Sequence, residues 1–467
     1  MNPSLYESLR KRLEALCPHR VLTAGHPRYD EVRGMFNGMH DRRPAVICLP
    51  ADGAEIQAVV TAGREAGIPV TVRGGGHNVA GSGSNDNGLV IDLRLMRQVT
   101  VDPEHALARV QGGATWDDVD AAAAEHGLAT TGGTVGSTGV AGLTLGGGLG
   151  YLSRSLGLTC DRVRSYRTVT GDGQRRQVDA DHDPQLNRLL RGAGHGLGVV
   201  EEFTFRLAPV SRVYGGRFAY SLRHAAPVLA AFGDLMADAP PELTCLLMLE
   251  PWGDPPARSV VANVFYSGGD QRVVDRIRST MGGCAPLTGL DFAPRSYLSM
   301  QASLGETDFG LRHYWTTCSL SALPGDLAEG LVEQYARGGC GDGVDDTIII
   351  TPLGGAVSTP AEPGAISFRD AAYTVLSMAI WRDPAQDDAR REWARGVTRL
   401  ARPWSLGGDG HVDYVNYASD PVDRHRPDGL SDETSRALRE VRARVDPDGV
   451  FTPVLPAAPA LPAPATA

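Results

Sequence analysis

The first candidate for a reactive side chain is His77. It follows three consecutive glycines, residues 74–76, which come soon after an apolar stretch at 68–72. Three glycines let a backbone turn sharply and bring its N–H groups up to a ligand with no Cβ in the way. Phosphate and pyrophosphate are the usual ligands of such a turn. The turn therefore indicates an anion cradle that presents its ligand to an imidazole, and a surface loop with an exposed histidine is the alternative that these local residues leave open.

Two more glycine runs follow, at 132–150 and 191–200, and the chain has 57 glycines in 467 residues, above the typical share of ~7%. A helix of this composition would be poor, because each interior glycine costs about 1 kcal/mol relative to alanine. A flexible linker would be polar, whereas the run at 132–150 carries Val, Leu and Thr at regular intervals. The three runs indicate one extended ligand that backbone approaches at several points. Arg191 either pairs with a phosphate of that ligand or forms a buried structural ion pair.

The elements that must position these groups follow from the hydrophobic pattern. A strand over 44–49, a helix capped by Asp52 and ended by Gly67, and the strand over 68–72 form a β-α-β unit, with the first glycine turn at the carboxyl end of a strand. The pattern also predicts helices over 5–16 and 118–126, strands over 88–93, 106–111 and 202–207, and a hairpin over 165–179 that turns at 171–173.

After Pro209 strands alternate with helices. Strands are expected over 215–222, 243–249, 259–266, 313–320 and 347–352, and helices over 224–237, 270–281, 325–337 and 385–401. This α+β composition predicts an antiparallel sheet with helices on one face, as a second domain that supplies a substrate pocket. A strand over 411–417 would then place Tyr414 and Asn416 on one face and Val415 and Tyr417 on the other. A last helix is expected over 431–445, and the Pro/Ala tail at 456–467 is expected to be disordered.

Composition excludes several classes of protein. The net charge of −10, without a Lys/Arg cluster, argues against a nucleic-acid partner. No apolar run reaches the roughly 20 residues that span a bilayer, and residues 1–20 lack the apolar middle of a signal peptide, so no membrane partner and a cytoplasmic location are expected. The seven cysteines are odd in number and lack a C-x-x-C pair, which fits neither a disulfide framework nor a zinc site. No His/Asp/Glu cluster has metal-ligand spacing, so no metal is expected.

Taken in order, the glycine runs and their neighbours resemble the berberine-bridge-enzyme-like FAD-linked oxidases, which are related to vanillyl-alcohol oxidase and share its PCMH-type FAD-binding domain. The resemblance is strong over about 40–210, moderate over 345–455 and weak over 211–340. The stretches that carry it are 73–77, 145–152, 157–161, 191–194 with 198–200, 414–417 and 446–451.

This resemblance implies a domain plan. An FAD-binding domain of two α/β subdomains would occupy 1–210, with its PCMH-type core at about 40–210. An antiparallel-sheet substrate domain with helices on one face would follow at 211–410, and a C-terminal segment at 411–455 would return to the FAD domain. The protein would act on a small molecule and O₂, as a monomer or homodimer.

The resemblance also implies which residues hold FAD. His77 would be linked covalently to the 8α-methyl group of the flavin, and relatives with a second link use a cysteine whose position here falls at Val135, so a single link is expected. The full set of implied cofactor contacts is Arg73, Gly74, Gly75, Gly76, His77, Asn78, Gly133, Val135, Thr138, Gly139, Gly142, Gly147, Gly148, Gly150, Tyr151, Asp161, Gly198, Val199, Val200, Tyr414 and Asn416.

For catalysis, the resemblance implies oxidation of a C–O or C–N centre of a small organic molecule, as in secondary metabolism, with electrons passing from the flavin to O₂ to give H₂O₂. Tyr414 matches the tyrosine base of many relatives, and its phenol, of ordinary pKa ~10, must be lowered to act at neutral pH. Tyr151 is a second, weaker candidate for the base, and Asn416 is the third residue assigned to catalysis. A glycine at Gly133 would leave O₂ a path to the flavin.

Three departures from the family pattern concern the substrate and the groups that assist the base. Phe368-Arg369 stands where relatives have His-Arg, residues 195–197 read His-Gly-Leu in place of Gly-Asn-Phe, and the last helix carries arginines in place of the usual Tyr-Gly and Lys. Two other functions stay open: a flavoprotein cyclase or isomerase with no net redox change, and an NADPH-dependent reductase on the same FAD scaffold. A covalent anchor at His77 argues against the reductase.

Overall fold

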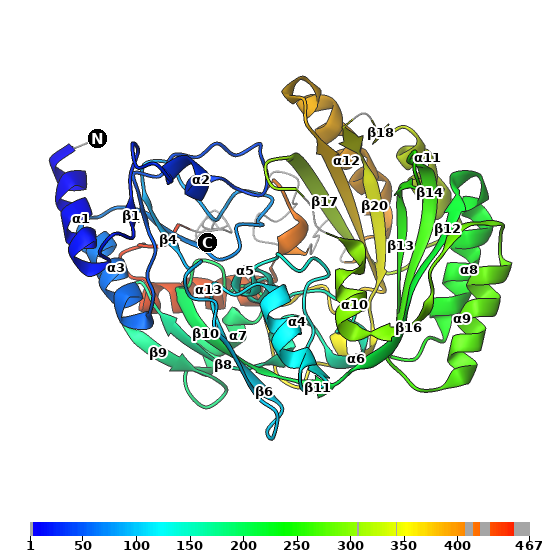
Figure 1. Cartoon of the computed structure of the whole chain (residues 1–467), viewed down its shortest axis with the longest axis horizontal. Coiled ribbons are helices and arrows are strands. Elements are labelled where there is room, and N and C mark those ends of the chain that lie inside the picture. Colours follow the sequence, from blue (N-terminus) through cyan, green and yellow to red (C-terminus); the bar gives the residue numbers. More distant parts are fainter. Residues whose placement is uncertain (1–2, 306–307, 342, 407–413, 421–429, 453–467) are drawn as a thin grey trace, which may run out of the picture.

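The computed structural model describes residues 3–305, 308–341, 343–406, 414–420 and 430–452. Figure 1 shows two halves side by side, a mixed half built largely from the N-terminal 210 residues and a half formed by one large twisted sheet with helices on its outer side. β17 (Arg312–Leu320) and the short turn at 415–417 lie where the two halves meet. Within the described part of the chain, no helix is long and apolar enough to cross a membrane.

The first glycine turn follows β3 in a small sheet of order β1-β2-β4-β3, in which β4 runs parallel to both β2 and β3. The predicted β-α-β unit is confirmed: the Asp52 carboxylate accepts from the Glu55 N–H at 2.9 Å and caps α3, which buries Ile56, Val59 and Val60. The elements of this part are α1 (Pro3–Leu16), β1 (Val21–Leu22), α2 (Tyr29–Arg33), β2 (Val46–Cys48), α3 (Gly53–Glu65), β3 (Val70–Arg73) and β4 (Leu89–Asp92).

A second sheet, of order β5-β6-β10-β8-β9, is antiparallel throughout. Its β8–β9 hairpin confirms the prediction for 165–179, with Tyr166 opposite Val178. The elements of this part are β5 (Val99–Asp102), β6 (Leu107–Gln111), α4 (Trp116–Ala124), β7 (Leu128–Ala129), α5 (Val140–Leu145), α6 (Ser153–Leu156), η1 (Thr159–Arg162), β8 (Val163–Val169), β9 (Arg175–Val178), α7 (Pro184–Leu190), β10 (Val199–Arg206) and β11 (Ala208–Pro209).

The large sheet has ten strands and antiparallel pairing throughout, with α8, α9, α11 and α12 packed on one face around a single core. This arrangement confirms the α+β prediction. Its elements are β12 (Arg212–Ser221), η2 (Leu222–His224), α8 (Ala225–Ala237), β13 (Leu243–Trp252), β14 (Ala257–Tyr266), α9 (Gln271–Gly283), β15 (Leu287–Leu290), β16 (Ala293–Ser296), α10 (Tyr297–Gln301), η3 (Ala302–Leu304), β17 (Arg312–Leu320), α11 (Gly325–Ala336), β18 (Cys340–Gly341), β19 (Val344–Asp345), β20 (Thr347–Pro352), η4 (Gly355–Val357), β21 (Tyr373–Trp381), η5 (Pro384–Gln386), α12 (Asp387–Ala401) and η6 (Arg402–Trp404).

Two differences from the sequence prediction concern the site. β21 was not predicted, although it lies between β20 and β17 and pairs with both. The predicted strand over 411–417 is wrong in its described part, because Val415–Tyr417 form a 3-10 turn, η7; residues 411–413 and the tail at 456–467 lie outside the described residues. Within this turn Tyr417 contacts Tyr414, with ring centroids 4.6 Å apart, so the two side chains are not on opposite faces.

The chain ends beside the first glycine turn. After α13 (Asp432–Val445), Asp446 accepts from the N–H groups of Val450 and Phe451 at 2.7 and 3.1 Å and closes a tight turn. The Val70 N–H then donates to the Val450 carbonyl at 2.9 Å, and the Thr452 N–H donates to the Val70 carbonyl at 3.1 Å. Residues 450–452 therefore extend the first sheet next to β3.

Candidate active site

The three glycine runs meet around one open cavity, whose volume is about 80 Å³. Gly74, Gly142 and Gly198, one from each run, lie in its wall, together with the end of the chain at Phe451 and Thr452. None of the residues that line it is acidic. The remaining lining residues are Val70, Thr71, Val72, Ser82, Leu93, Ala141, Leu145, His195, Gly196 and Val200.

Glycine serves two different purposes here. A Cβ built on Gly142 would meet no atom within 4 Å, so this glycine leaves open space at the cavity wall that a side chain would fill. Gly75 and Gly139 instead let two backbones touch: a Cβ on Gly139 would lie 2.3 Å from the Gly75 nitrogen. The dense glycine composition thus reflects both a ligand cradle and the close packing of the runs on each other.

Among the residues that sequence analysis assigned to the cofactor, Gly74, Gly142, Gly198 and Val200 line this cavity. Four other assigned residues are close to lining residues in sequence but do not line the cavity themselves: Gly75, Gly76, Gly139 and Val199. The Gly76 carbonyl accepts from the Phe36 N–H at 3.2 Å, and the Val199 carbonyl accepts from the Thr168 hydroxyl at 3.1 Å. Asn78 holds its own loop, because its side-chain oxygen accepts from the Ser82 N–H at 3.0 Å.

Arg73 turns away from the cavity. Its guanidinium donates to the Val32 carbonyl at 2.6 Å and to the Gly34 carbonyl, and its Nε lies 3.7 Å from the buried Asp92 carboxylate. Burial lowers the pKa of Arg73. Arg73 therefore fixes the segment at 32–36 beside the glycine turn.

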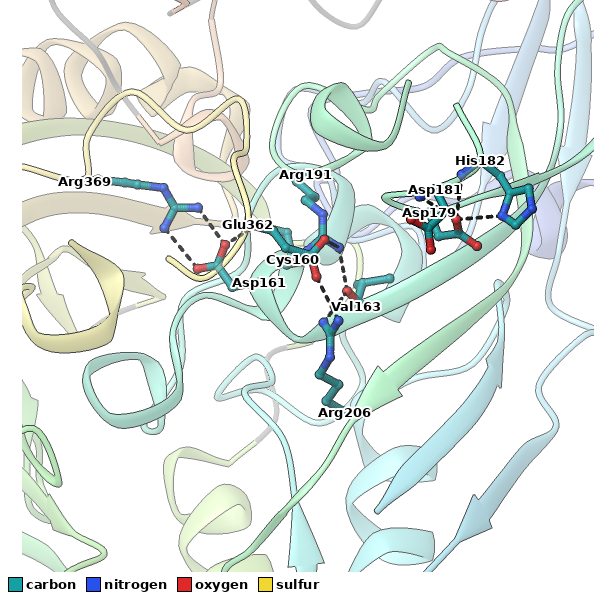
Figure 2. Close-up of polar contacts among 10 residues, drawn as sticks. All are labelled: Cys160, Asp161, Val163, Asp179, Asp181, His182, Arg191, Arg206, Glu362 and Arg369. Carbon is teal, nitrogen blue, oxygen red and sulfur yellow. Dashed lines mark hydrogen bonds and ion pairs between the residues drawn. The ribbon is translucent and has the colours of Figure 1, made fainter. Parts of the chain in front are cut away.

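Arg191 and Asp161 form structural ion pairs in one polar cluster, which Figure 2 shows. The fully buried Arg191 donates to the Cys160 and Val163 carbonyls at 2.8 and 2.7 Å and pairs with Glu362 at 2.7 Å. Of the two alternatives for Arg191, the structure shows the buried ion pair. Asp161 forms a two-bond pair with Arg369, at 2.6 and 3.0 Å, and its side chain faces that arginine (Figure 2).

The remaining assigned residues hold the second glycine run in shape. The Val135 carbonyl accepts from the Thr138 N–H at 3.1 Å, and the Thr138 carbonyl accepts from the Trp116 N–H at 3.1 Å. Gly133 lies against Leu143 and Trp116, and its carbonyl accepts from Gln301 at 3.1 Å. The Gly147 carbonyl accepts from the Cys160 N–H at 2.8 Å, and a Cβ on Gly150 would lie 1.8 Å from the Gly132 carbonyl oxygen.

His77 is half-buried at the end of the first turn, in an aromatic stack that joins the two halves. Its ring stacks on Phe36 at 4.7 Å between centroids, and Phe36 stacks in turn on His313 of β17 at 4.3 Å. Phe309 meets His77 edge-on at 4.9 Å. Aromatic packing of this kind restricts the orientation of the imidazole.

Tyr414 is fully buried, and three donors point at its phenolic oxygen. The N–H groups of Gly148 and Leu149 donate at 3.1 and 3.2 Å, and the Asn416 amide donates at 2.8 Å. Asn416 is itself fixed, because its amide also donates to the Leu143 carbonyl at 3.0 Å. The 3-10 turn thus brings Tyr414 and Asn416 together by a different geometry from the predicted strand, and it places both on the second glycine run.

Burial raises the pKa of Tyr414, and the neighbouring Tyr417 adds to that rise. The three hydrogen bonds act in the opposite direction, because each is stronger to a phenolate than to a phenol. A neutral phenol oxygen has two acceptor lone pairs, so three donors directed at it match the electron distribution of the deprotonated form. The arrangement is suited to hold negative charge on this oxygen.

Tyr151 lies apart from this arrangement. Its hydroxyl accepts from the Asn263 amide at 2.8 Å, and its ring stacks on Phe265 at 5.4 Å within a cluster on the large sheet. Burial raises the pKa of Tyr151. The residues that line the cavity do not include Tyr151 or Asp161, nor His77, Tyr414 or Asn416.

Sequence analysis missed several residues of the site. His195 was noted only as a departure, yet it lines the cavity and its ring nitrogen Nε2 lies 2.8 Å from the Gly142 carbonyl oxygen, which connects the second and third runs. Phe36 and His313 carry no local signal, since each is one aromatic ring in an unremarkable segment. Phe451 belongs to the stretch 446–451 that carries the family resemblance, but neither Phe451 nor the following Thr452 was assigned to the cofactor.

The lining of the cavity suits a partly anionic cofactor such as FAD. Four of its fifteen residues are glycines, Gly142 leaves open space at the wall, and no acidic side chain in the lining set would repel a phosphate. Among the described residues, no group of three or more His, Cys, Asp or Glu side chains could hold a metal ion.

Comparisons with known proteins agree with this fit. Residues 44–179 match the family described as "FAD binding domain". The chain is 29% identical to (R)-6-hydroxynicotine oxidase of Paenarthrobacter nicotinovorans, over 84% of this chain and 81% of that protein. Its fold matches the crystal structure of 6-hydroxy-D-nicotine oxidase from Arthrobacter nicotinovorans with a TM-score of 0.83 at 24% identity, over 95% of this chain and 99% of that one. BBE-like 1 of Physcomitrella patens matches with a TM-score of 0.84 at 19% identity, over 97% and 99%.

The matched FAD-binding domain contains the first two glycine runs, and the likeness to flavoprotein oxidases extends over both halves of the molecule. The chain is therefore an FAD-dependent oxidoreductase, and its fold is that of 6-hydroxy-D-nicotine oxidase and BBE-like 1.

Proposed function

We propose that the protein oxidises a C–O or C–N centre of a small organic molecule, with O₂ as the final electron acceptor and H₂O₂ as the second product. When bound, FAD supplies the two-electron acceptor for this chemistry. The observation that carries the proposal is the set of three hydrogen-bond donors on the buried Tyr414 oxygen, beside the second glycine run.

Tyr414 is the base in this proposal. It takes the proton from the O–H or N–H group of the substrate as the neighbouring carbon is oxidised, and Asn416 with the Gly148 and Leu149 N–H groups stabilises the phenolate that must be present beforehand. Because backbone supplies two of the donors, little reorganisation is needed when the charge appears or leaves. Tyr151 is not given this role, since its hydroxyl is engaged by Asn263 in a separate cluster.

His77 is the residue that we propose for a covalent link to FAD, and the link is single. A neutral imidazole is a competent nucleophile, and the stack on Phe36 fixes its ring beside the glycine turn. Val135 supplies no thiol for a second link. Cys160, the cysteine nearest to the glycine runs in sequence, is fully buried, and burial raises the pKa of its thiol, which makes it a poor nucleophile.

The oxidase proposal is tested without knowing the substrate. The purified holoenzyme is photoreduced under argon and then mixed with air-saturated buffer. We expect the visible absorbance of oxidised flavin to return within seconds, with one H₂O₂ formed for each flavin. Reoxidation on a scale of many minutes, or rapid reduction of the oxidised protein by NADPH, would contradict the proposal and favour a reductase.

The covalent link has its own test. Acid-precipitated protein should remain yellow, and the tryptic peptide that contains His77 should carry the mass of FAD. His77→Ala should release its flavin under acid, with turnover reduced by up to about 10²-fold, because the flavin is then positioned by non-covalent contacts alone. Loss of the colour from acid-treated wild-type protein would disprove the link.

A further inference from the structure

The large sheet has a second face, opposite its helices. On β17, Tyr314 and Cys318 point into the core under those helices, so His313, Trp315 and Thr317 point to the other side. The same alternation places Leu376 and Met378 of β21 on this side, where Trp315 lies opposite Met378 and Thr317 opposite Leu376. We call this side of β17, β20 and β21 the inner face.

The inner face has no charged side chain in these three strands, all of whose residues the structure describes: it carries Thr, Ser, Ile, Leu, Met, Trp and His. Its histidine is neutral at pH 7, because burial lowers the pKa of His313 to about 4. Farther along the same side of the sheet, at β12 and β13, Arg217 and Glu250 introduce charge.

The inner face is continuous with the proposed base. The backbone N–H of Trp315 donates to the Ser419 hydroxyl at 2.8 Å, and the backbone N–H of Ser419 donates to the Trp315 carbonyl at 3.0 Å. This pair of bonds holds the η7 segment on β17. The Trp315 and Tyr417 rings then meet at 6.1 Å, and Tyr417 meets Tyr414 at 4.6 Å. The ring of Tyr417 thus lies between Trp315 and the phenol of Tyr414, and it connects a molecule stacked on Trp315 with the proposed base.

Several polar atoms on the inner face have no hydrogen-bond partner among the described residues. They are the indole nitrogen of Trp315, both ring nitrogens of the fully buried His313 and the hydroxyl of Ser319. A buried polar group without a partner costs about 1–3 kcal/mol, so such atoms mark places where a ligand atom completes the bonding. The indole N–H can only donate, and it therefore requires an acceptor on the ligand.

We propose that the substrate is a neutral, planar aromatic molecule that bears an oxygen acceptor, a hydroxyl or a carbonyl, and that it binds flat against Trp315 with this oxygen toward the indole N–H. The inference rests on the proposed function, because it places this molecule beside Tyr414. The half-buried rings of Trp315 and Tyr417 supply its stacking surface, and Met378 and Ile349 supply apolar contact.

An oligosaccharide fits this surface poorly. Each of its many hydroxyls needs a partner, and the inner face of these three strands offers short hydroxyls and a few donors, with no carboxylate, amide or guanidinium. The one arginine of the three strands, Arg312, pairs with Asp387 on the helix side. Hydroxyls buried without a partner cost about 1–3 kcal/mol each. A planar ring with one oxygen needs a single partner, which Trp315 can provide.

The test uses the holoenzyme and two neutral probes, 2-naphthol and cellobiose, with Kd measured by calorimetric titration. We expect 2-naphthol to bind and cellobiose to bind at least tenfold more weakly. Trp315→Ala should weaken 2-naphthol by about tenfold, because both stacking and the hydrogen bond are lost. Trp315→Phe, which keeps a ring and removes the N–H, should weaken it by about fivefold. Trp404→Phe, on the helix side of the sheet, is the matched control and should leave Kd unchanged.

Three results would overturn the inference: cellobiose binding as tightly as 2-naphthol, no binding of 2-naphthol at millimolar concentration, or an unchanged Kd in both Trp315 variants. The conservative Trp315→Phe keeps the test valid should Trp315→Ala fail to fold. The photoreduction experiment separates this failure from that of the proposed function. Fast reoxidation by O₂ together with preferential binding of cellobiose would leave the oxidase standing and remove the aromatic substrate.

Discussion

The proposed catalytic centre has two sides, the cofactor cavity and the inner face of the large sheet, and different kinds of groups form them. On the cofactor side, glycines of three separate runs, Gly74, Gly142 and Gly198, bring backbone to the cavity wall. On the proposed substrate side, alternating side chains of β17 and β21 form the surface, as the Trp315–Met378 pair illustrates. Backbone contacts serve one fixed ligand, whereas side chains can change without altering the fold. The comparison explains why the cofactor is evident from composition and the substrate is not.

The largest expected effect concerns Tyr414, which belongs to the segment between these two sides. Tyr414→Phe should slow flavin reduction by about 10²–10⁴-fold with whichever alcohol or amine reduces the wild-type protein, since the base is lost. The wild-type rate should rise with pH as the base deprotonates, and the variant should lose this dependence. Stopped-flow reduction under argon across a pH series measures both effects.

The matched control for that experiment is Tyr166→Phe. Tyr166 is a fully buried tyrosine in the core of the second sheet, and its hydroxyl has no partner among the described residues, so its removal should leave the rate and the pH profile unchanged. If Tyr414→Phe kept the wild-type pH profile and lost only stability, Tyr414 would be a structural residue that satisfies three donors.

A second prediction concerns the junction of the two sides. The Gln301 amide donates to the buried Asp120 carboxylate at 2.9 Å and to the Gly133 carbonyl at 3.1 Å. Burial raises the pKa of Asp120 from 3.8 to about 7. Because the folded-state pKa is raised, the native protein binds this proton more tightly than the unfolded chain. Stability should therefore fall as the pH rises from about 4 to 7, by at most about 4 kcal/mol.

Asp120→Asn removes this titration and keeps the side-chain shape. The free energy of unfolding of the variant should exceed that of the wild type increasingly from pH 5 to 8, and denaturant titrations at several pH values measure the difference. Asp118→Asn provides a comparison on the same helix, where the carboxylate pairs with Arg97 near the surface. A constant difference between wild type and Asp120→Asn across this range would show that Asp120 does not bind the extra proton.

A third, smaller effect separates the two uses of glycine on the cofactor side. Gly139→Ala should destabilise the fold by about 1–3 kcal/mol, because its Cβ would lie 2.3 Å from the Gly75 nitrogen. Gly142→Ala should leave stability unchanged or raise it by up to about 1 kcal/mol, since it lies in α5, while its methyl group enters the cavity. We expect lower flavin occupancy of purified Gly142→Ala with an unchanged Tm of the flavin-free fraction. Full occupancy would mean that the cofactor does not approach Gly142.

These contrasts also show what sequence could and could not predict. The three runs and the Asp52 cap depend on local residue types, and they led to the right fold and cofactor. Arg191 stayed undecided because its partner Glu362 is 171 positions away in the chain. β21 was missed although its apolar run at 373–381 has the length of a buried strand. Tyr414 and Asn416 were expected side by side on a strand. They do lie side by side, but in a 3-10 turn, where the Leu143 carbonyl fixes Asn416. Phe36 and His313 meet only in three dimensions.

The smallest expected effect tests the second tyrosine. Tyr151 is next to the second glycine run in sequence, but its hydroxyl accepts from Asn263 and its ring stacks on Phe265, within the sheet side of the molecule. Tyr151→Phe should lower the free energy of unfolding by about 1 kcal/mol, the value of one buried hydrogen bond, and should change the rate of flavin reduction by less than tenfold. Asn263→Leu together with Tyr151→Phe should restore part of that stability, because the amide then leaves no unpaired donor. If Tyr151→Phe instead abolished flavin reduction while Tyr414→Phe left it unchanged, Tyr151 would be the base. The catalytic proton transfer would then take place on the large sheet, and not beside the second glycine run.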